Sequence, residues 1–352
     1  MVISRTPFRV SFFGGGTDYP GWYLQHGGAV LATTINKYCY LTCRYLPPFF
    51  EHRLRVVYSK IEDCVSVDEI KHPAVRATLK HLKFDRGIEI HHDGDLPGRS
   101  GMGSSSAFTV GLLNAIQALQ GNITSKKQLA SEAIHIEQEV LKETVGSQDQ
   151  VCAAYGGLNK ITFAQEPGFS IQPITLSSDR LRELNSHLML FYTGIKRTAS
   201  NVASSYVADM GSRAELLRRT RDYVDSACDL LASRQDLAPF GEVLHEAWLA
   251  KRALSDKVSN AHVDALYEEA RAGGALGGKL LGAGGGGFLL LFAPPSKQAD
   301  IRARLSRLIH VPFKFEFGGS QIIFYDLEED FSKHDYEREA QAIEAFRELE
   351  EP

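Results

Sequence analysis

The sequence predicts an α+β protein with two domains. Its 352 residues are enough for two domains of ordinary size, and its 43% hydrophobic and 23% charged residues are typical of a globular chain. The first part contains apolar, β-branched stretches that favour strands, beginning with residues 2–13. The last part contains a continuously apolar strand at 288–293, followed by a helical pattern and two further strands, which indicates a small α+β sandwich.

Charge and cysteine content exclude several classes of function. A formal net charge of −4 gives no basic footprint for nucleic acid or for an anionic membrane surface. The five cysteines are odd in number, so we expect reduced thiols, and Cys39 and Cys43 lack the second pair that a zinc site needs. Neither a signal-peptide layout nor a membrane-spanning apolar run is present, so we expect a cytoplasmic protein that binds neither nucleic acid nor a membrane.

The strand at residues 2–13 leads into the first candidate site. It ends in three consecutive glycines, which let a ligand approach the backbone, and Thr17 and Asp18 follow. The Asp18 carboxylate is an acceptor for sugar hydroxyls, and Arg9 provides a fixed cation nearby. The alternative is a capped turn with Arg9 in a surface ion pair.

Further strands are expected at residues 29–45, 53–59 and 87–92, and residues 61–84 contain short helical patterns.

The segment 96–107, LPGRSGMGSSSA, is the central motif of the first domain. Its glycines permit a sharp bend that brings backbone N–H groups together around an anion, and a helical pattern follows whose N-terminus favours phosphate. We therefore predict a polyphosphate cradle that lacks the lysine of the common P-loop, the alternative being a plain turn.

Residues 125–157 combine a helix, a turn and a second helix. Ser125 caps the first helix, which carries Glu137, and the turn that follows contains Asp149. Phosphoryl transfer uses hard oxygen ligands for Mg²⁺ and a group that accepts the proton of the attacking hydroxyl, and carboxylates suit both tasks. The alternative for each residue is an ordinary solvated carboxylate.

A strand at 188–192 opens the second domain, and helical patterns cover 199–233 and 240–258. Arg197 and Lys251 are candidates for holding an anionic group of the acceptor, although solvated or carboxylate-paired basic residues remain the alternative. Residues 273–287 are so rich in glycine that another segment must approach their backbone closely. The remaining expected elements are a helix near 296–308, strands at 311–317 and 321–325, and a charged helix from about residue 327.

Four segments together resemble the GHMP kinase superfamily of galactokinases and homoserine, mevalonate and phosphomevalonate kinases. They are R-V-x-x-x-G-x-x-T-D-Y from Arg9, P-x-x-x-G-x-G-S-S-x-A from Pro97, the turn that contains Asp149, and K-x-x-G-A-G-G-G-G from Lys279. They follow the order of the superfamily and span nearly the whole chain. Galactokinases carry Glu-His where this chain has two glycines, which argues against galactose as the acceptor.

This resemblance implies a fold and a set of site residues. The fold is the two-domain GHMP kinase fold, with an N-terminal mixed α/β domain (1–187) containing a left-handed βαβ nucleotide site and a C-terminal ferredoxin-like α+β domain (188–352). Asp149 and Arg9 are implied to be catalytic, and Ser105 and Glu137 to bind Mg²⁺. The expected nucleotide-binding residues are Pro97, Gly98, Arg99, Ser100, Gly101, Met102, Gly103, Ser104, Ser105 and Ser106. The expected substrate-binding residues are Gly14, Gly15, Gly16, Thr17, Asp18, Asp149, Arg197, Lys251, Gly284 and Gly285.

The first and last motifs are most similar to those of D-glycero-D-manno-heptose 7-phosphate kinases. This similarity implies transfer from ATP to the anomeric hydroxyl of a sugar phosphate, on the way to nucleotide-activated heptose for lipopolysaccharide or an S-layer. The alternatives are L-fucose kinase or another GHMP small-molecule kinase, and a non-catalytic ligand sensor of the same fold. The expected ligands are ATP, Mg²⁺ and a sugar phosphate, and the oligomeric state is open, with a homodimer among the alternatives.

Overall fold

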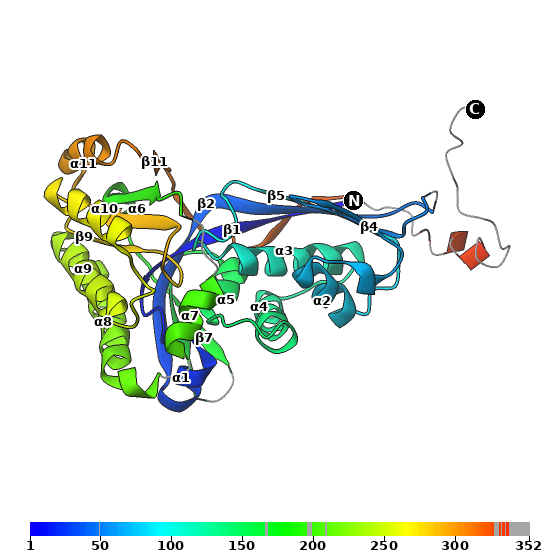
Figure 1. The fold of residues 1–352 in the computed structure, drawn as a ribbon, viewed down its shortest axis with the longest axis horizontal. Coiled ribbons are helices and arrows are strands. Elements are labelled where there is room, and N and C mark those ends of the chain that lie inside the picture. The colour runs from blue at the N-terminus through cyan, green and yellow to red at the C-terminus, as the bar shows by residue number, and fades with distance from the viewer. Residues whose placement is uncertain are drawn as a thin grey trace.

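The computed structural model describes residues 1–48, 50–165, 168–195, 199–207 and 210–326, together with residues 331, 333, 334, 336 and 337. The molecule is elongated, and its two lobes are each built around a sheet of their own (Figure 1). The first lobe contains the N-terminus and the larger sheet. In the described ranges, no helix has the length and apolar character that crossing a bilayer requires.

The sheet of the first lobe is built on two long antiparallel strands, β1 (Val2–Phe13) and β2 (Gly28–Tyr45). Its other strands are β3 (Leu54–Val57), β4 (Ile61–Cys64), β5 (Ile88–Gly94), β6 (Asn159–Phe163), β7 (Phe169–Pro173), β12 (Phe315–Glu316) and β13 (Gln321–Tyr325). Their order is β13-β1-β2-β5-β3-β4, with β12 and β6 also paired to β2, and β7 paired to β6. The end of β1 therefore lies in the middle of the molecule, where it delivers the residues of the candidate site.

The strand β4 corrects the sequence prediction, which expected only short helical patterns in residues 61–84. Residues 61–64 alternate between exposed and buried positions, which is the two-residue period of a strand. The buried Glu62 carboxylate accepts hydrogen bonds from the backbone N–H groups of Lys71 and His72 and so connects this edge strand to the next helix. The helical part of the prediction holds for η1 (Val67–Glu69) and α2 (Pro73–His81).

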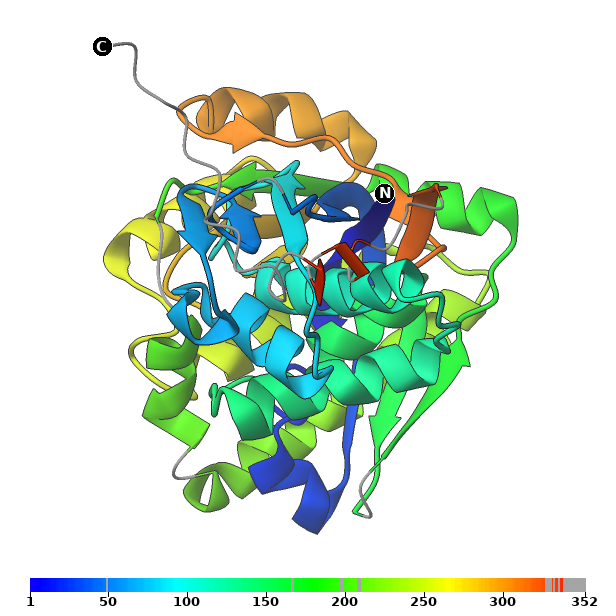
Figure 2. The same ribbon diagram turned by 90° about the vertical axis from the view of Figure 1, so that its right-hand side faces the viewer.

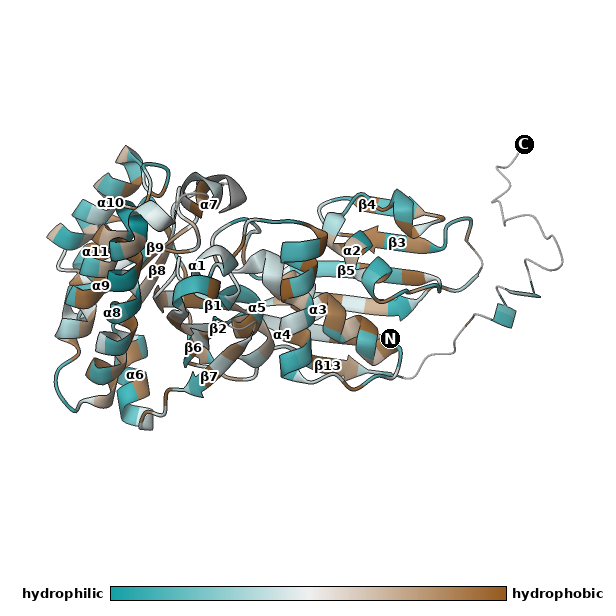
Figure 3. Cartoon of the chain, turned by 90° about the horizontal axis from the view of Figure 1, so that it is seen from below, coloured by the Kyte–Doolittle hydropathy of each residue, from teal (hydrophilic) through white to brown (hydrophobic). Residues whose placement is uncertain are grey.

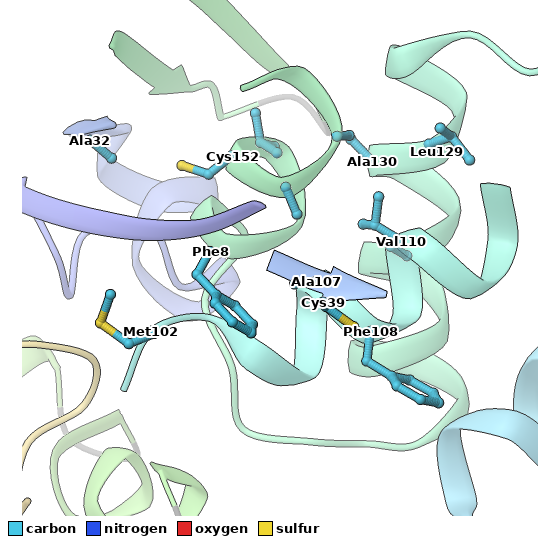
Figure 4. Packing of buried hydrophobic residues seen from close by; sticks show 14 of the residues in the cluster. Phe8, Ala32, Cys39, Met102, Ala107, Phe108, Val110, Leu129, Ala130 and Cys152 are labelled. Carbon is cyan, nitrogen blue, oxygen red and sulfur yellow. The ribbon is translucent and has the colours of Figure 1, made fainter. Parts of the chain in front are cut away.

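The helix α3 (Ser104–Leu119) is central to the first lobe. It packs on β1 and β2 and contacts α2, α4 (Lys126–His135) and α5 (Gln148–Tyr155), which lie with it beneath the sheet (Figures 1 and 2). Because α3 is apolar on most sides, its residues Phe108 and Val110 are buried in the same cluster as Phe8 of β1 (Figure 4). This packing fixes the N-terminus of α3 beside β1. The lobe also contains α1 (Pro20–His26) and the π-helical turn η2 (Ile136–Val140).

The second lobe contains a four-stranded antiparallel sheet. Its strands are β8 (Leu188–Tyr192), β9 (Gly277–Leu280), β10 (Phe288–Phe292) and β11 (Ile309–His310), and their order is β11-β8-β10-β9. Its helices include α8 (Ala214–Ala232), α9 (Ala238–Arg252), α10 (Ala261–Ala272) and α11 (Gln298–Arg304). Hydrophilic residues follow much of the outer side of these helices (Figure 3). Counted along the chain, this strand order is 4-1-3-2, so the ferredoxin-like prediction is confirmed.

Several predicted boundaries differ from the structure. The helical region 199–233 is divided into α7 (Ala199–Val207), the single turn η3 (Gly211–Arg213) and α8, and Gly211 is a poor residue for a helix interior. The helix predicted at 240–258 ends at Arg252, and a turn held by Ser255 follows, since the N–H of Val258 donates to the Ser255 carbonyl oxygen. The helix predicted from residue 327 begins outside the described residues.

The last two described strands return to the first lobe. β13 pairs with β1 and β12 pairs with β2, although the sequence division assigned residues 315–325 to the second domain. The other elements are α6 (Ser178–Ser186), which leads into the second lobe, and η4 (Pro295–Lys297). The chain thus crosses between the lobes twice, and the segments before β8 and after β11 connect them.

Candidate active site

A cavity of about 430 Å³ is lined by residues of both lobes. Its walls come from the glycine turn after β1, the loop before α3, residues of the segment 142–149, and Gly282 with Ala283 after β9. The structure therefore brings together the separate motifs that the sequence analysis singled out. Lys251 of α9 and Lys279 of β9 line the same cavity from the second lobe.

Close packing of glycines joins the phosphate loop to the glycine-rich segment of the second lobe. A Cβ added to Gly101 would lie 2.5 Å from the Leu281 carbonyl oxygen, and one added to Gly282 would lie 2.6 Å from the Gly101 Cα. The N–H of Phe288 also donates to the Ser100 carbonyl oxygen over 3.2 Å. Side chains larger than hydrogen would push the two segments apart, so the glycines are required for the lobes to meet at this point.

The Arg9 guanidinium binds the Asp149 carboxylate at the floor of the cavity. Nε donates to Oδ1 over 2.7 Å, Nη2 donates to Oδ2 over 2.8 Å, and Nη1 donates to the Gly101 carbonyl oxygen over 2.6 Å. Burial acts to lower the pKa of Arg9, but the Asp149 carboxylate outweighs it and raises that pKa, so Arg9 stays charged. A bidentate pair of this kind fixes the direction of the carboxylate as well as its charge.

The phosphate loop ends in the N-terminus of α3. Gly103 stands at the cap position with a φ of 72°, and no side chain caps the first N–H groups of the helix, which leaves them available to an anion. Ser104, Ser105 and Ser106 line the cavity, together with Arg99. Four other predicted nucleotide-binding residues do not line it. Pro97 and Gly98 precede the bend, Ser100 donates its hydroxyl to the Pro97 carbonyl oxygen, and Met102 is buried in the core (Figure 4).

Glu137 lies behind the serines and is fully buried. Its carboxylate accepts hydrogen bonds from the hydroxyls of Ser106, over 2.7 Å, and Thr109, over 2.9 Å, and from the side-chain amide of Gln150. Burial raises the pKa of Glu137 to about 7, and these three neutral donors only partly oppose that rise. Glu137 does not line the cavity itself, and its contact is with Ser106 rather than with Ser105.

The glycine turn after β1 contributes unequally to the cavity. Gly15, Gly16 and Asp18 line it, whereas Gly14 and Thr17 do not. Asp18 is buried, and its carboxylate accepts hydrogen bonds from the N–H of Gly16 and from the side-chain amide of Gln148, both over 2.9 Å. Burial raises the pKa of Asp18 despite these donors. The Thr17 hydroxyl holds the turn together through carbonyl oxygens.

Other predicted substrate-binding residues have different positions. The structure does not bring Gly284 and Gly285 to the cavity, because both pack against the backbone at Val258. Lys251 does line the cavity, as the sequence suggested. Arg197 lies outside the described residues.

Sequence reasoning missed several lining residues. Lys279 is the first residue of the glycine-rich motif K-x-x-G-A-G-G-G-G, and its place in that motif could have identified it as a site residue. Gln148, next to the expected catalytic aspartate, holds Asp18. Lys142 and Glu143 also line the cavity. Lys142 has a left-handed φ of 54°, which no sequence pattern predicts.

Each lobe contains a segment that matches a known protein family. Residues 69–157 match the family model of the GHMP kinases N terminal domain, and residues 228–310 match that of the GHMP kinases C terminal domain. The chain is 27% identical over 311 residues to the D-glycero-alpha-D-manno-heptose 7-phosphate kinase of Campylobacter jejuni, with 85% of this chain and 91% of that protein covered. It is 28% identical over 329 residues to the bifunctional fucokinase/GDP-fucose pyrophosphorylase of Arabidopsis thaliana, covering 85% of this chain but only 30% of that protein.

The same fold occurs among solved structures. A D-glycero-D-manno-heptose 1-phosphate kinase from Bacteroides thetaiotaomicron superposes with a TM-score of 0.76 at 21% identity, with 93% of this chain and 100% of that chain covered. Both family domains match in order, and their motifs meet in one cavity. The chain therefore contains the N-terminal and the C-terminal domain of the GHMP kinases.

Proposed function

We propose that this kinase transfers the γ-phosphate of ATP to the anomeric hydroxyl of D-glycero-D-manno-heptose 7-phosphate, giving the 1,7-bisphosphate. The observation that carries the proposal is the position of Asp149 beside the phosphate loop. An ideal Cβ on Gly103 would lie 3.4 Å from its Oδ2, so the carboxylate is adjacent to the residue that caps α3. A hydroxyl bound against Asp149 would therefore face a phosphate held at the helix N-terminus.

In this proposal Asp149 acts on the acceptor hydroxyl. Its carboxylate accepts the proton as the hydroxyl oxygen attacks the γ-phosphorus, and the bond to the leaving ADP oxygen breaks. Arg9 places its positive charge against the carboxylate and orients it through its two hydrogen bonds. Whether Asp149 takes the proton fully or only orients the hydroxyl, the same pair of residues is needed.

The phosphates of ATP are proposed to bind at the N-terminus of α3. Free backbone N–H groups and the positive end of the helix dipole stabilise negative charge there. Arg99 lines this part of the cavity and supplies a cation in a loop that has no P-loop lysine. The hydroxyls of Ser104 and Ser105 add further donors, whereas the Ser106 hydroxyl donates to Glu137.

Glu137, which lies directly behind the cavity wall, and the serines in front of it carry the kind of oxygen atoms that Mg²⁺ prefers. A fully buried carboxylate whose hydrogen-bond partners are all neutral is a group that a cation would stabilise in its ionised form. We propose that Ser105 and Glu137 hold the ion and that Ser106 orients the Glu137 carboxylate. When bound, Mg²⁺ neutralises charge on the β- and γ-phosphates.

The acceptor is proposed to bind between the glycine turn and the second lobe. Gly15 and Gly16 leave room for a sugar, and Asp18 and Lys251 face the same space. The names of the two heptose kinases described above place a phosphate at different positions of the sugar, position 7 in one and position 1 in the other. The site of transfer is therefore part of what must be tested.

A panel of acceptors tests the proposal. Release of ADP from MgATP is measured with heptose 7-phosphate, L-fucose, galactose and mevalonate. We expect heptose 7-phosphate to be preferred in kcat/KM by about 100-fold or more. Preference for L-fucose would favour the second candidate, which the similarity to the Arabidopsis fucokinase supports. Binding of ATP without turnover of any acceptor would favour a ligand sensor.

A further inference from the structure

Two lysine ammonium groups are buried in the cavity wall with backbone carbonyl groups as their hydrogen-bond partners. Lys279 is 5% exposed, and its Nζ donates to the Phe12 carbonyl oxygen over 2.8 Å. Lys251 is 7% exposed, and its Nζ donates to the carbonyl oxygens of Leu280, over 3.0 Å, and Gly282. Both side chains line the cavity, so a ligand there can reach them.

These contacts leave donors unused. An ammonium group has three N–H donors, so Lys279 retains two and Lys251 retains one beyond the hydrogen bonds described. Neither ammonium forms an ion pair with a carboxylate of the described residues. Burying two cations without a counter-charge is unfavourable, because they lose hydration and repel each other. An anion that binds near both offsets this unfavourable free energy.

The charged groups that face the two lysines do not neutralise them. Asp149 is already paired with Arg9, and Asp18 is held by neutral donors. Burial, assisted by Arg9, lowers the pKa of Lys251 to about 7. Burial, assisted by Lys251, lowers the pKa of Lys279 well below its usual range. A bound anion would raise both pKa values and so favour the charged ammonium forms.

Lys279 lies beside the proposed acceptor side of the cavity, and Lys251 lies between that side and the phosphate loop, because its partner Gly282 packs on Gly101. The carbonyl partner of Lys279 is Phe12, two positions before the glycine turn that carries Asp18. The N-terminus of α3 has its own donors for nucleotide phosphates, namely its free N–H groups and Arg99. The two ammonium groups come instead from α9 and β9 of the second lobe.

We infer that Lys279 and Lys251 form a subsite for a second anionic group on the acceptor, of which a phosphate monoester is the best match. Three N–H donors from two side chains suit the several oxygens of a phosphate. The inference rests on the proposed function and extends it, because it makes Lys279 a residue that distinguishes phosphorylated from unphosphorylated sugars.

The test uses Lys279→Met and Lys251→Met, with Lys257→Met as the control at an exposed lysine. KM and kcat are measured for heptose 7-phosphate, for the same heptose without phosphate, and for ATP. We expect each cavity variant to raise the KM for heptose 7-phosphate by about 10- to 100-fold. The KM values for unphosphorylated heptose and ATP should stay within about threefold of wild type, and the control should change none of them.

Two results would overturn the inference. Equal losses for both sugars would mean that the lysines are structural, and a raised KM for ATP alone would mean that they hold the nucleotide. If the wild-type chain phosphorylates neither heptose, it is the proposed function that fails. Inorganic phosphate then tests the subsite, because it should raise the Tm of wild type more than that of Lys279→Met, and equal shifts would contradict the subsite.

Loss of folding in the variants does not prevent the test. In that case inhibition of the wild-type enzyme by inorganic phosphate is measured against each substrate. Inhibition that is competitive with heptose 7-phosphate supports the subsite. Inhibition that is competitive with ATP alone contradicts it.

Discussion

Arg9 and Asp149, which are 140 positions apart in the sequence, are joined by two parallel hydrogen bonds of 2.7 and 2.8 Å. The third bond of the same guanidinium, from Nη1, ends on the Gly101 carbonyl oxygen of the phosphate loop. One side chain therefore fixes both the carboxylate proposed to face the acceptor and the loop proposed to bind ATP. The chemistry of the site depends on this geometry, and the following predictions test it.

Replacement of the carboxylate should separate binding from turnover. Asp149→Asn retains the size of the side chain but can no longer accept a proton, so we expect kcat to fall by about 1,000-fold or more. ATP affinity should stay within about threefold, since the phosphate loop is intact. Steady-state kinetics and titration with a non-hydrolysable ATP analogue measure the two effects. A variant that turns over normally but binds ATP weakly would assign Asp149 to the nucleotide instead.

Arg9 should not be replaceable by another cation. Lysine lacks the planar fork that binds both carboxylate oxygens, so Arg9→Lys should lower kcat by about 10- to 100-fold and lower the Tm. Arg5→Lys on the same strand is the matched control, because Arg5 lies away from the cavity, where it donates to Gln321 and stacks on the Tyr38 ring, and the change should leave kcat as in wild type. Equal kcat for the two variants and wild type would show that the bidentate geometry is not needed.

The contact between the glycine segments should be sensitive to a single methyl group. Gly101 has a φ of 81°, and a Cβ there would lie 2.5 Å from the Leu281 carbonyl oxygen. We expect Gly101→Ala to lower the free energy of unfolding by about 2 kcal/mol or more and to raise the KM for ATP. Gly98→Ala in the same loop meets nothing within 4 Å and serves as the control. Urea denaturation compares them, and similar free energies of unfolding would rule out the tight packing.

Glu137 should make stability depend on pH in a definite direction. Burial raises its pKa from 4.5 to about 7 in the folded state, so the folded chain binds the proton more tightly than the unfolded chain. The contribution of this proton to the free energy of unfolding is therefore complete below pH 4.5, and it is lost as the pH rises through about 7. In magnesium-free buffer, the free energy of unfolding of wild type relative to Glu137→Gln should therefore fall over this range. A difference that does not vary with pH would contradict the raised pKa.

Much of the first lobe could be predicted from the sequence because its signals are local. The alternation of residues in β1 and β2 and the glycine bend before α3 are readable from short windows. The pairing of Arg9 with Asp149 is different. The resemblance to a family implied that both residues are catalytic, but their hydrogen bonds come from the structure, because no local pattern connects residues 140 positions apart.

Other parts of the site depend on contacts that the sequence does not display. Gly284 and Gly285 belong to the same glycine run as Gly282, yet they face Val258, because successive residues of a turn point in different directions. Lys279 resembles any strand lysine until the first lobe packs against it and its Nζ reaches the Phe12 carbonyl oxygen. The short strand β4 was missed because its buried positions include a glutamate, and the burial of that side chain is explained only by the backbone N–H groups it binds.

The most direct test of the central claim is ³¹P NMR of wild type and Asp149→Asn incubated with MgATP and heptose 7-phosphate. We expect a new phosphate ester resonance, coupled to the anomeric proton, that grows with wild type in step with ADP and is absent with the variant. An ester at another hydroxyl, or equal product from the two proteins, would contradict it.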